Sequence, residues 1–120
     1  MKKIILVLIG ISIISCSKES ETKYSTESDN VFLIITENTT ETELTNIASE
    51  FKTEKNIIVD FSKTEFNENG TIKNLNLEVD CNDGFKGVAK SSGVILKVKN
   101  SGFSRDYSKN SKVPFVIGAM

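Results

Sequence analysis

One stretch of the chain has the periodicity of an amphipathic helix. Thr40 is followed three residues later by Glu43, a capping-box pattern that marks the first turn of a helix. Four apolar side chains then recur at i, i+3, i+4 and i+7, which places them on one helical face: Leu44, Ile47, Ala48 and Phe51. We therefore predict a helix over about residues 41–53, with this face at the centre of the hydrophobic core.

Five stretches have the patterns of β-strands. Residues 31–36 are apolar on both faces, as in a central strand, and residues 57–62 alternate between apolar and polar. Three later stretches also have strand-like patterns: residues 75–81, 85–90 and 94–98. The last of them is either a fifth strand or an extension of the fourth past a bend.

The segments between and after these stretches predict turns, a loop and an edge strand. Residues 67–70 and 82–84 contain the Asn, Asp and Gly that tight turns favour. Residues 100–112 are polar, and we expect a loop there. The apolar tail, residues 113–117, is expected to add an edge strand, where Pro114 removes no needed hydrogen bond.

Together these elements predict an α+β fold in one domain, residues 31–120. The expected order is β-α-β-β-β, with a single helix packed on a mostly antiparallel sheet. Residues 16–30 are polar and charged without an apolar pattern, so we expect a solvated tether there.

The first fifteen residues have the pattern of a signal peptide. Lys2 and Lys3 precede an apolar run over residues 4–14, which is shorter than the roughly 20 residues that span a bilayer as a helix. The run ends in Ile13-Ile14-Ser15-Cys16, which resembles the lipobox of bacterial lipoproteins. That resemblance implies cleavage before Cys16, a lipid on Cys16, and a place in the cell envelope at the outer membrane.

A second resemblance covers residues 31–92. Residues 34–44, with Phe51-Lys52 and residues 69–73, look like an accessory domain of Bacteroidetes proteins. It resembles the C-terminal domain of membrane metallopeptidases of the β-lactam-sensor antirepressor kind, and segments of small lipoproteins. No residue matches the zinc motif of the peptidase part. The resemblance therefore implies an extracytoplasmic accessory domain without that catalytic site.

Composition narrows the chemistry further. The chain has 15 basic and 16 acidic residues, and without Lys2 and Lys3 the net charge is 13 minus 16, or −3. This balance gives no basic surface for binding nucleic acid. The partners we expect are the membrane, through the lipid, and an unidentified envelope protein. There is no histidine, which removes the commonest general base and the commonest metal ligand. We expect no cofactor, no metal and no enzymatic activity.

Cys81 is the one cysteine left once Cys16 carries lipid, and its thiol could act as a nucleophile. It alternates in phase with Leu75, Leu77 and Val79, so we expect a buried, unreactive thiol. The sequence from Asp80 to Gly84 superficially resembles a calcium loop, but its glycine and its twelfth position do not fit. A hairpin turn explains it better.

One helix can cover only one face of a sheet, so the opposite face is left available for contact with another segment or a partner. Four large apolar residues are expected there: Phe32, Ile34, Ile58 and Ile95. A contiguous apolar patch marks a contact surface, so either the C-terminal tail folds over it or a partner docks there. We favour the tail.

Three functions stay open on the sequence alone. The first is a non-enzymatic binding or accessory module at the envelope. The second is an inhibitor or regulator of an envelope enzyme such as a peptidase, and the third is an enzyme of an unrecognised type.

Overall fold

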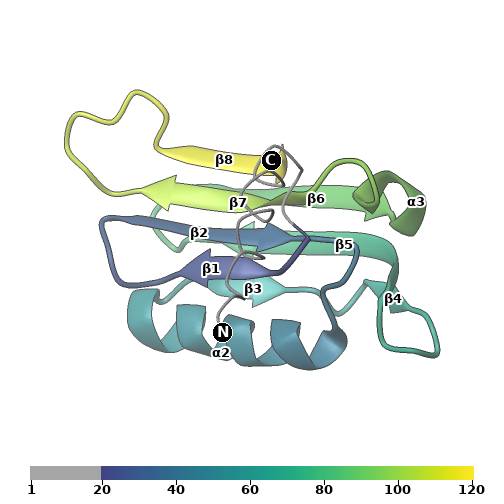
Figure 1. Cartoon of the computed structure of the whole chain (residues 1–120). Helices are drawn as coiled ribbons and strands as arrows, with labels where there is room; N and C mark the ends of the chain where they lie inside the picture. The colour runs from purple at the N-terminus through teal and green to yellow at the C-terminus, as the bar shows by residue number, and fades with distance from the viewer. Residues whose placement is uncertain (1–19) are drawn as a thin grey trace, which may run out of the picture.

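The computed structural model describes residues 20–120, so the leader and Cys16 lie outside the described residues. Two antiparallel β-sheets face each other, and one long helix, α2 (Glu41–Lys55), closes one side of this sandwich (Figure 1). The chain is therefore α+β with mostly antiparallel strands, as predicted, although it has two sheets in place of the single sheet expected. Within residues 20–120, no helix is long and apolar enough to cross a bilayer.

The first sheet joins the two ends of the described chain. Its strands lie in the order β1-β2-β7-β8 and have these bounds: β1 Lys23–Ser25, β2 Asn30–Ile35, β7 Ser101–Asp106 and β8 Phe115–Ala119. β2 is a central strand, because it pairs with β1 on one side and with β7 on the other. Val31, Leu33 and Ile35 point inward along β2 and are fully buried.

The second sheet is centred on the long strand β5. β6 pairs with one side of β5, and two short strands share the other side. The bounds of these strands are β3 Ile58–Asp60, β4 Glu65–Phe66, β5 Ile72–Asp80 and β6 Lys86–Ser92. Leu75, Leu77 and Val79 are buried against the first sheet, so the alternating residues between them lie on the outer face.

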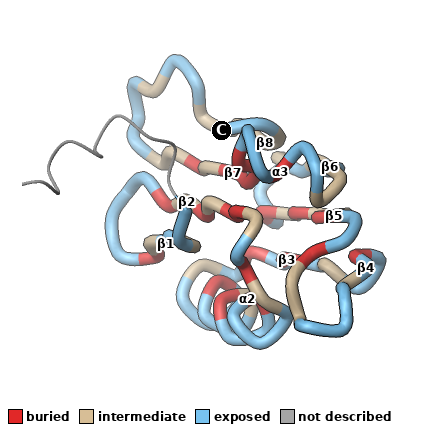
Figure 2. The backbone as a smooth tube through the Cα atoms, turned by 45° about the vertical axis from the view of Figure 1, so that its right-hand side comes forward, coloured by how far each residue is buried: buried red, intermediate tan, exposed pale blue. Residues whose placement is uncertain are grey.

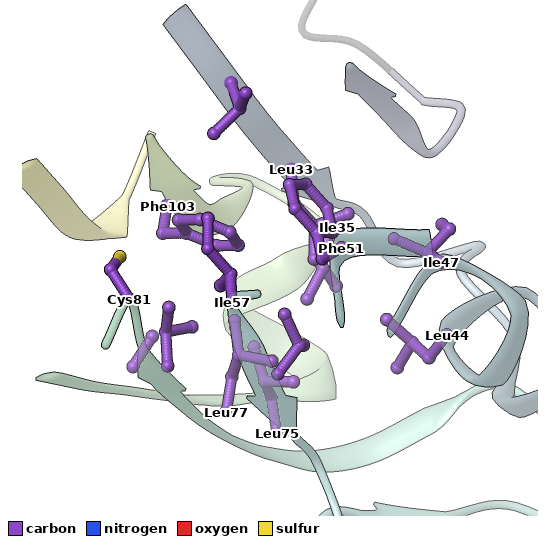
Figure 3. Packing of buried hydrophobic residues seen from close by; sticks show 14 of the residues in the cluster. Leu33, Ile35, Leu44, Ile47, Phe51, Ile57, Leu75, Leu77, Cys81 and Phe103 are labelled. Carbon is purple, nitrogen blue, oxygen red and sulfur yellow. The ribbon is translucent and has the colours of Figure 1, made fainter. Parts of the chain in front are cut away.

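The core lies between the two sheets and α2. Phe51 of α2 and Phe103 of β7 meet there, with their ring centroids 5.2 Å apart (Figure 3). Leu44 and Ile47 are buried with Phe51, and Ala48 is partly buried, so the predicted helical face is confirmed. Figure 2 shows buried positions along the facing strands and on one side of α2, with exposed positions concentrated in the loops.

Local hydrogen bonds fix both ends of α2. Thr40 Oγ1 accepts a hydrogen bond from the Glu43 N–H at 3.3 Å, and the Glu43 carboxylate accepts one from the Thr40 N–H at 3.0 Å. The predicted capping box is therefore confirmed. Asn56 ends the helix in the left-handed conformation with φ of 56°, and its N–H bonds to the Lys52 carbonyl.

The stretch predicted as a fifth strand is instead a short helix, α3 (Gly93–Leu96). The Ser92 hydroxyl caps it by accepting a hydrogen bond from a backbone N–H three residues later. Gly93 approaches β5 so closely that an added Cβ would be 2.7 Å from the Ile72 carbonyl oxygen. The chain therefore turns out of the sheet here, and of the three alternating apolar residues only Leu96 is buried.

The polar stretch predicted as a loop contains β7, an interior strand of the first sheet. Phe103 is fully buried there, and Arg105 also points inward. The loop prediction over residues 100–112 is therefore wrong for Ser101–Asp106. The prediction failed because the charged side chain of Arg105 occupies an inward position, which breaks the apolar alternation of a half-buried strand.

The two ends of the first sheet also differ from the prediction. Residues 23–25 lie in the expected tether but form the edge strand β1, where the Tyr24 ring lies 6.3 Å from the Phe51 ring. The tail adds the edge strand β8, as predicted, but does not cover an outer face. Ile117 of β8 instead meets Gly87 of β6, so the tail closes the side of the sandwich opposite α2 (Figure 1).

Candidate functional site

The four residues expected on one contact face lie on three different surfaces. Phe32 and Ile34 lie half-buried on the outer face of the first sheet, because Val31, Leu33 and Ile35 take the inward positions of β2. Ile58 lies on the outer face of the second sheet, opposite Asp80 of β5. Ile95 belongs to α3. The structure does not bring the four together, and contact of any of them with a partner stays a prediction.

Cys81 is buried next to charged and aromatic side chains at the end of β5. Burial, together with the smaller effect of the nearby Asp83 carboxylate, raises the pKa of its thiol to about 11. The thiol is therefore protonated at neutral pH, whereas a nucleophilic cysteine needs its pKa lowered toward the thiolate form. Its predicted burial is confirmed, and its low reactivity stays a prediction.

Arg105 lies at the centre of a part-buried polar cluster. Its Nε and Nη2 donate to one Asp83 carboxylate oxygen at 3.0 and 2.7 Å. Its Nη1 donates to the carbonyls of Asp106 at 2.6 Å and Pro114 at 3.2 Å. The guanidinium carbon also lies 4.5 Å from each of two ring centroids, those of Phe85 and Tyr107.

This Arg105 cluster connects three parts of the chain that are distant in sequence. Asp83 lies in the turn between β5 and β6, Arg105 near the end of β7, and Pro114 just before β8. Because Nε and both terminal nitrogens already donate within the protein, the guanidinium is poorly placed to bind an external anion. The cluster is a structural clamp. The predicted turn at residues 82–84 is confirmed, with Asn82 and Gly84 at positive φ.

The outer face of the second sheet carries an open hollow of about 490 Å³. We call it the outer hollow, and its lining side chains come from β3, β5 and β6: Ile58, Asp60, Glu78, Asp80, Lys86 and Val88. Ile58 is 37% exposed and Val88 is 49% exposed. The hollow thus combines two accessible aliphatic groups with charged side chains on the solvent side of the domain.

The sheet register fixes how these groups alternate. Asp80 lies between Ile58 and Lys86 in one cross-strand row, and Glu78 lies between Asp60 and Val88 in the next row. The two apolar residues are therefore two strands apart, a separation on the order of 10 Å, with the carboxylates of β5 between them. This arrangement can receive a segment that presents two apolar side chains around a cation.

The charges around the outer hollow are held in place by neighbouring groups. Lys63 Nζ contacts the Glu78 carboxylate at 3.1 Å. Hydrogen bonds from Ser62 keep the pKa of the Asp60 carboxyl below its usual value, so this group is ionised at neutral pH. Asp80 accepts from the Asn82 N–H at 2.9 Å but keeps a second carboxylate oxygen for other partners.

Sequence reasoning missed Val88 and the carboxylates of β5. A signal was present, because Val88 stands between Lys86 and Lys90 in the polar phase of its strand. An apolar residue in that phase points to solvent when its neighbours pack inward. Within residues 20–120, no group of three or more His, Cys, Asp or Glu side chains is placed to hold a metal ion.

Comparisons with known proteins give no match. No protein-family model matches the chain, and neither a curated protein nor a solved structure matches it.

Proposed function

We propose that this protein is an envelope lipoprotein that works as a non-enzymatic binding module. A lipid on Cys16 would hold it at the outer membrane, and the outer hollow would bind a partner protein. The partner we infer presents apolar side chains around a basic residue, to match Ile58, Val88 and the carboxylates between them.

The outer hollow is the single observation that carries the binding role. Ile58 and Val88 expose aliphatic surface on a rigid sheet whose other face is committed to the core. Burying a Val or Ile side chain fully is worth roughly 1.5–3 kcal/mol, so two half-exposed residues could contribute a useful part of a binding energy. The Asp80 carboxylate between them adds selectivity, since a partner without a matching cation would take it out of water without giving it a counter-charge.

The proposal of a lipid anchor is supported by the sequence of the residues that precede the described part of the chain. Lys2 and Lys3, the short apolar run and Cys16 have the order and spacing of a lipoprotein leader. One acyl chain binds a membrane only marginally, and two or more give stable attachment. The lipoprotein resemblance implies such multiple acylation at Cys16.

A non-enzymatic role is supported by the surroundings of Cys81 and Arg105. The surroundings of Cys81 keep its thiol protonated, and the Arg105 guanidinium donates its hydrogen bonds to groups within the domain. These groups stabilise the domain and have no free capacity to act on a substrate. The carboxylates of the outer hollow lie in an open, solvated depression, where water would compete with general acid–base chemistry.

Site-specific crosslinking in intact cells tests the binding role. A photo-crosslinking amino acid is placed at Val88 or Ile58, and at Val113 as the matched control. Val113 is also an exposed aliphatic residue, 59% exposed, but lies in the β7–β8 loop away from the outer hollow. We expect one discrete crosslinked product from Val88 and Ile58, and none of that mass from Val113.

A charge variant tests whether the outer hollow is the surface that forms the crosslinked product. Asp80→Lys reverses the central charge of the outer hollow and should remove the product formed from Val88. Identical products from all three positions, or none from any, would refute the outer hollow as a binding site.

A further inference from the structure

Three aliphatic side chains project from the α3 segment into solvent. Val94 is 74% exposed, Ile95 is 51% exposed, and Val98 is 76% exposed. We call these three residues the α3 patch. Lys97 and Lys99 alternate with them and are also exposed. A protruding apolar segment interleaved with lysines is typical of surfaces that contact a lipid headgroup layer.

The α3 patch is held rigidly. Leu96 is fully buried and fixes the segment to the core, while Gly93 lies against the backbone of β5. The N–H groups of residues 97, 98 and 99 donate to carbonyls of Val94 and Ile95. Because these backbone groups are already paired, the segment could enter an interfacial layer without exposing unsatisfied N–H groups there.

The α3 patch lies at the end of the sandwich where the described chain begins. The Ser20 carbonyl accepts hydrogen bonds from Asn38 Nδ2 at 2.9 Å and from Thr36 Oγ1 at 3.2 Å. Asn38 and Val94 line the same surface depression. Figure 1 likewise shows α3 at the end toward which β2 points and where α2 begins.

The distance to the proposed anchor is short. Ser20 follows Cys16 after only three intervening residues, so the four steps of a fully extended chain would span at most about 14 Å. A lipid on Cys16 sits at the membrane interface, and the end of the sandwich that carries the α3 patch must therefore stay close to it. The short connection between Cys16 and Ser20 would therefore keep the lipid surface close to the α3 patch.

We propose that the α3 patch docks into the headgroup layer of the anchoring membrane, with Lys97 and Lys99 at the lipid phosphates. This inference rests on the proposed lipid anchor. Glu41 and Glu43, in the first turn of α2 at the same end, would be repelled by anionic lipid. The domain therefore tilts so that α3 meets the membrane and α2 stays away from it. The outer hollow, which extends along β3, β5 and β6, then faces sideways toward a partner.

A fluorophore attached at Val98→Cys in the full-length protein tests the docking. The matched control is Val113→Cys, in the β7–β8 loop at the opposite end of the sandwich. Cys81 is buried and its thiol pKa is about 11, so the introduced cysteine is labelled selectively in the folded protein. Both proteins are reconstituted into vesicles of phosphatidylethanolamine and phosphatidylglycerol that contain nitroxide-labelled lipid.

We expect nitroxide lipid to quench the fluorophore at position 98 several-fold more than the one at position 113. Equal, solvent-like emission at both positions, in protein whose mass shows an acylated Cys16, would overturn the docking and leave the anchor intact. A shielded label at position 98 that nitroxide lipid does not quench would mean that protein covers the patch, and would equally overturn it. Protein without lipid on Cys16 would overturn the anchor, and the docking with it.

Discussion

Removing the Asp83 carboxylate is expected to lower the free energy of unfolding by more than an ordinary surface substitution does. Asp83→Ala leaves the Arg105 guanidinium without the oxygen that now accepts two of its hydrogen bonds. The Arg105 side chain is 11% exposed and the Asp83 side chain 32% exposed, so water can reach the vacated site only in part. Breaking a buried ion pair costs about 3–5 kcal/mol, and partial access for water lowers this to about 2–3 kcal/mol here.

A double-mutant cycle separates the pair from its surroundings. Arg105→Met removes the charge but keeps an apolar side chain between the rings of Phe85 and Tyr107. The double variant leaves no charge alone, so it should recover part of the loss, with a coupling of about 1–2 kcal/mol. Arg105→Lys serves as a second comparison, because it keeps the charge but loses the planar, forked geometry.

Urea denaturation followed by circular dichroism measures these differences. With a slope of about 1–3 kcal/mol per molar urea, a loss of about 2–3 kcal/mol in Asp83→Ala should lower the midpoint by about 0.7–3 M. A loss below about 0.5 kcal/mol, within the range of ordinary surface changes, would refute the clamp, as would an absence of coupling in the double variant.

Three further outcomes are expected, one from the core and two from Cys81. Phe51→Ala should cost about 3–5 kcal/mol, because it opens a cavity against Phe103; the exposed change Val113→Ala is its control, and equal melting temperatures for the two would mean that the core is wrongly placed. The Cys81 thiol, with its pKa raised from 9.0 to about 11, should react slowly with thiol reagents until the protein unfolds. Its raised folded-state pKa means that its contribution to stability is fully present below pH 9. That contribution is lost as the pH rises to about 11, a loss on the order of 2–3 kcal/mol that Cys81→Ala should remove. Rapid labelling of the native protein, or the same alkaline loss in the variant, would contradict this assignment.

The parts of the fold that the sequence predicts are those determined by local patterns. The capping box at Thr40 and the stripe ending at Phe51 are encoded within four turns of one helix, and both are present. The alternation of β5 is similarly local, because its inward residues are apolar and its outward residues polar. The division into two sheets depends instead on pairings between distant segments, such as β2 with β7. Those pairings leave no periodic signal in either strand.

The prediction failed where a residue departs from the usual chemistry of its position. In β7 the inward position of Arg105 is made tolerable by Asp83 and two aromatic rings, which lie far away in sequence. In α3 and just after it, the alternation of Val94, Leu96 and Val98 fits a strand, but the close approach of Gly93 to β5 turns the chain outward.

The candidate site shows the same division. Ile58 could be placed on an outer face from its own strand. The outer hollow, however, needs the register of three strands, and so do the positions of Val88 and the β5 carboxylates. The α3 patch consists of residues expected in a strand, so its exposure follows only from the three-dimensional structure.

The mass of the mature protein, compared between the native chain and Cys16→Ala, tests the central claim most directly. We predict that the native protein begins at Cys16, carries covalently bound lipid there, and enters the detergent phase. Cys16→Ala should keep its leader or remain in the aqueous phase. A mature native chain without lipid, or a Cys16→Ala protein that is still cleaved before residue 16 and enters the detergent phase, would contradict the claim that this domain is a lipid-anchored module.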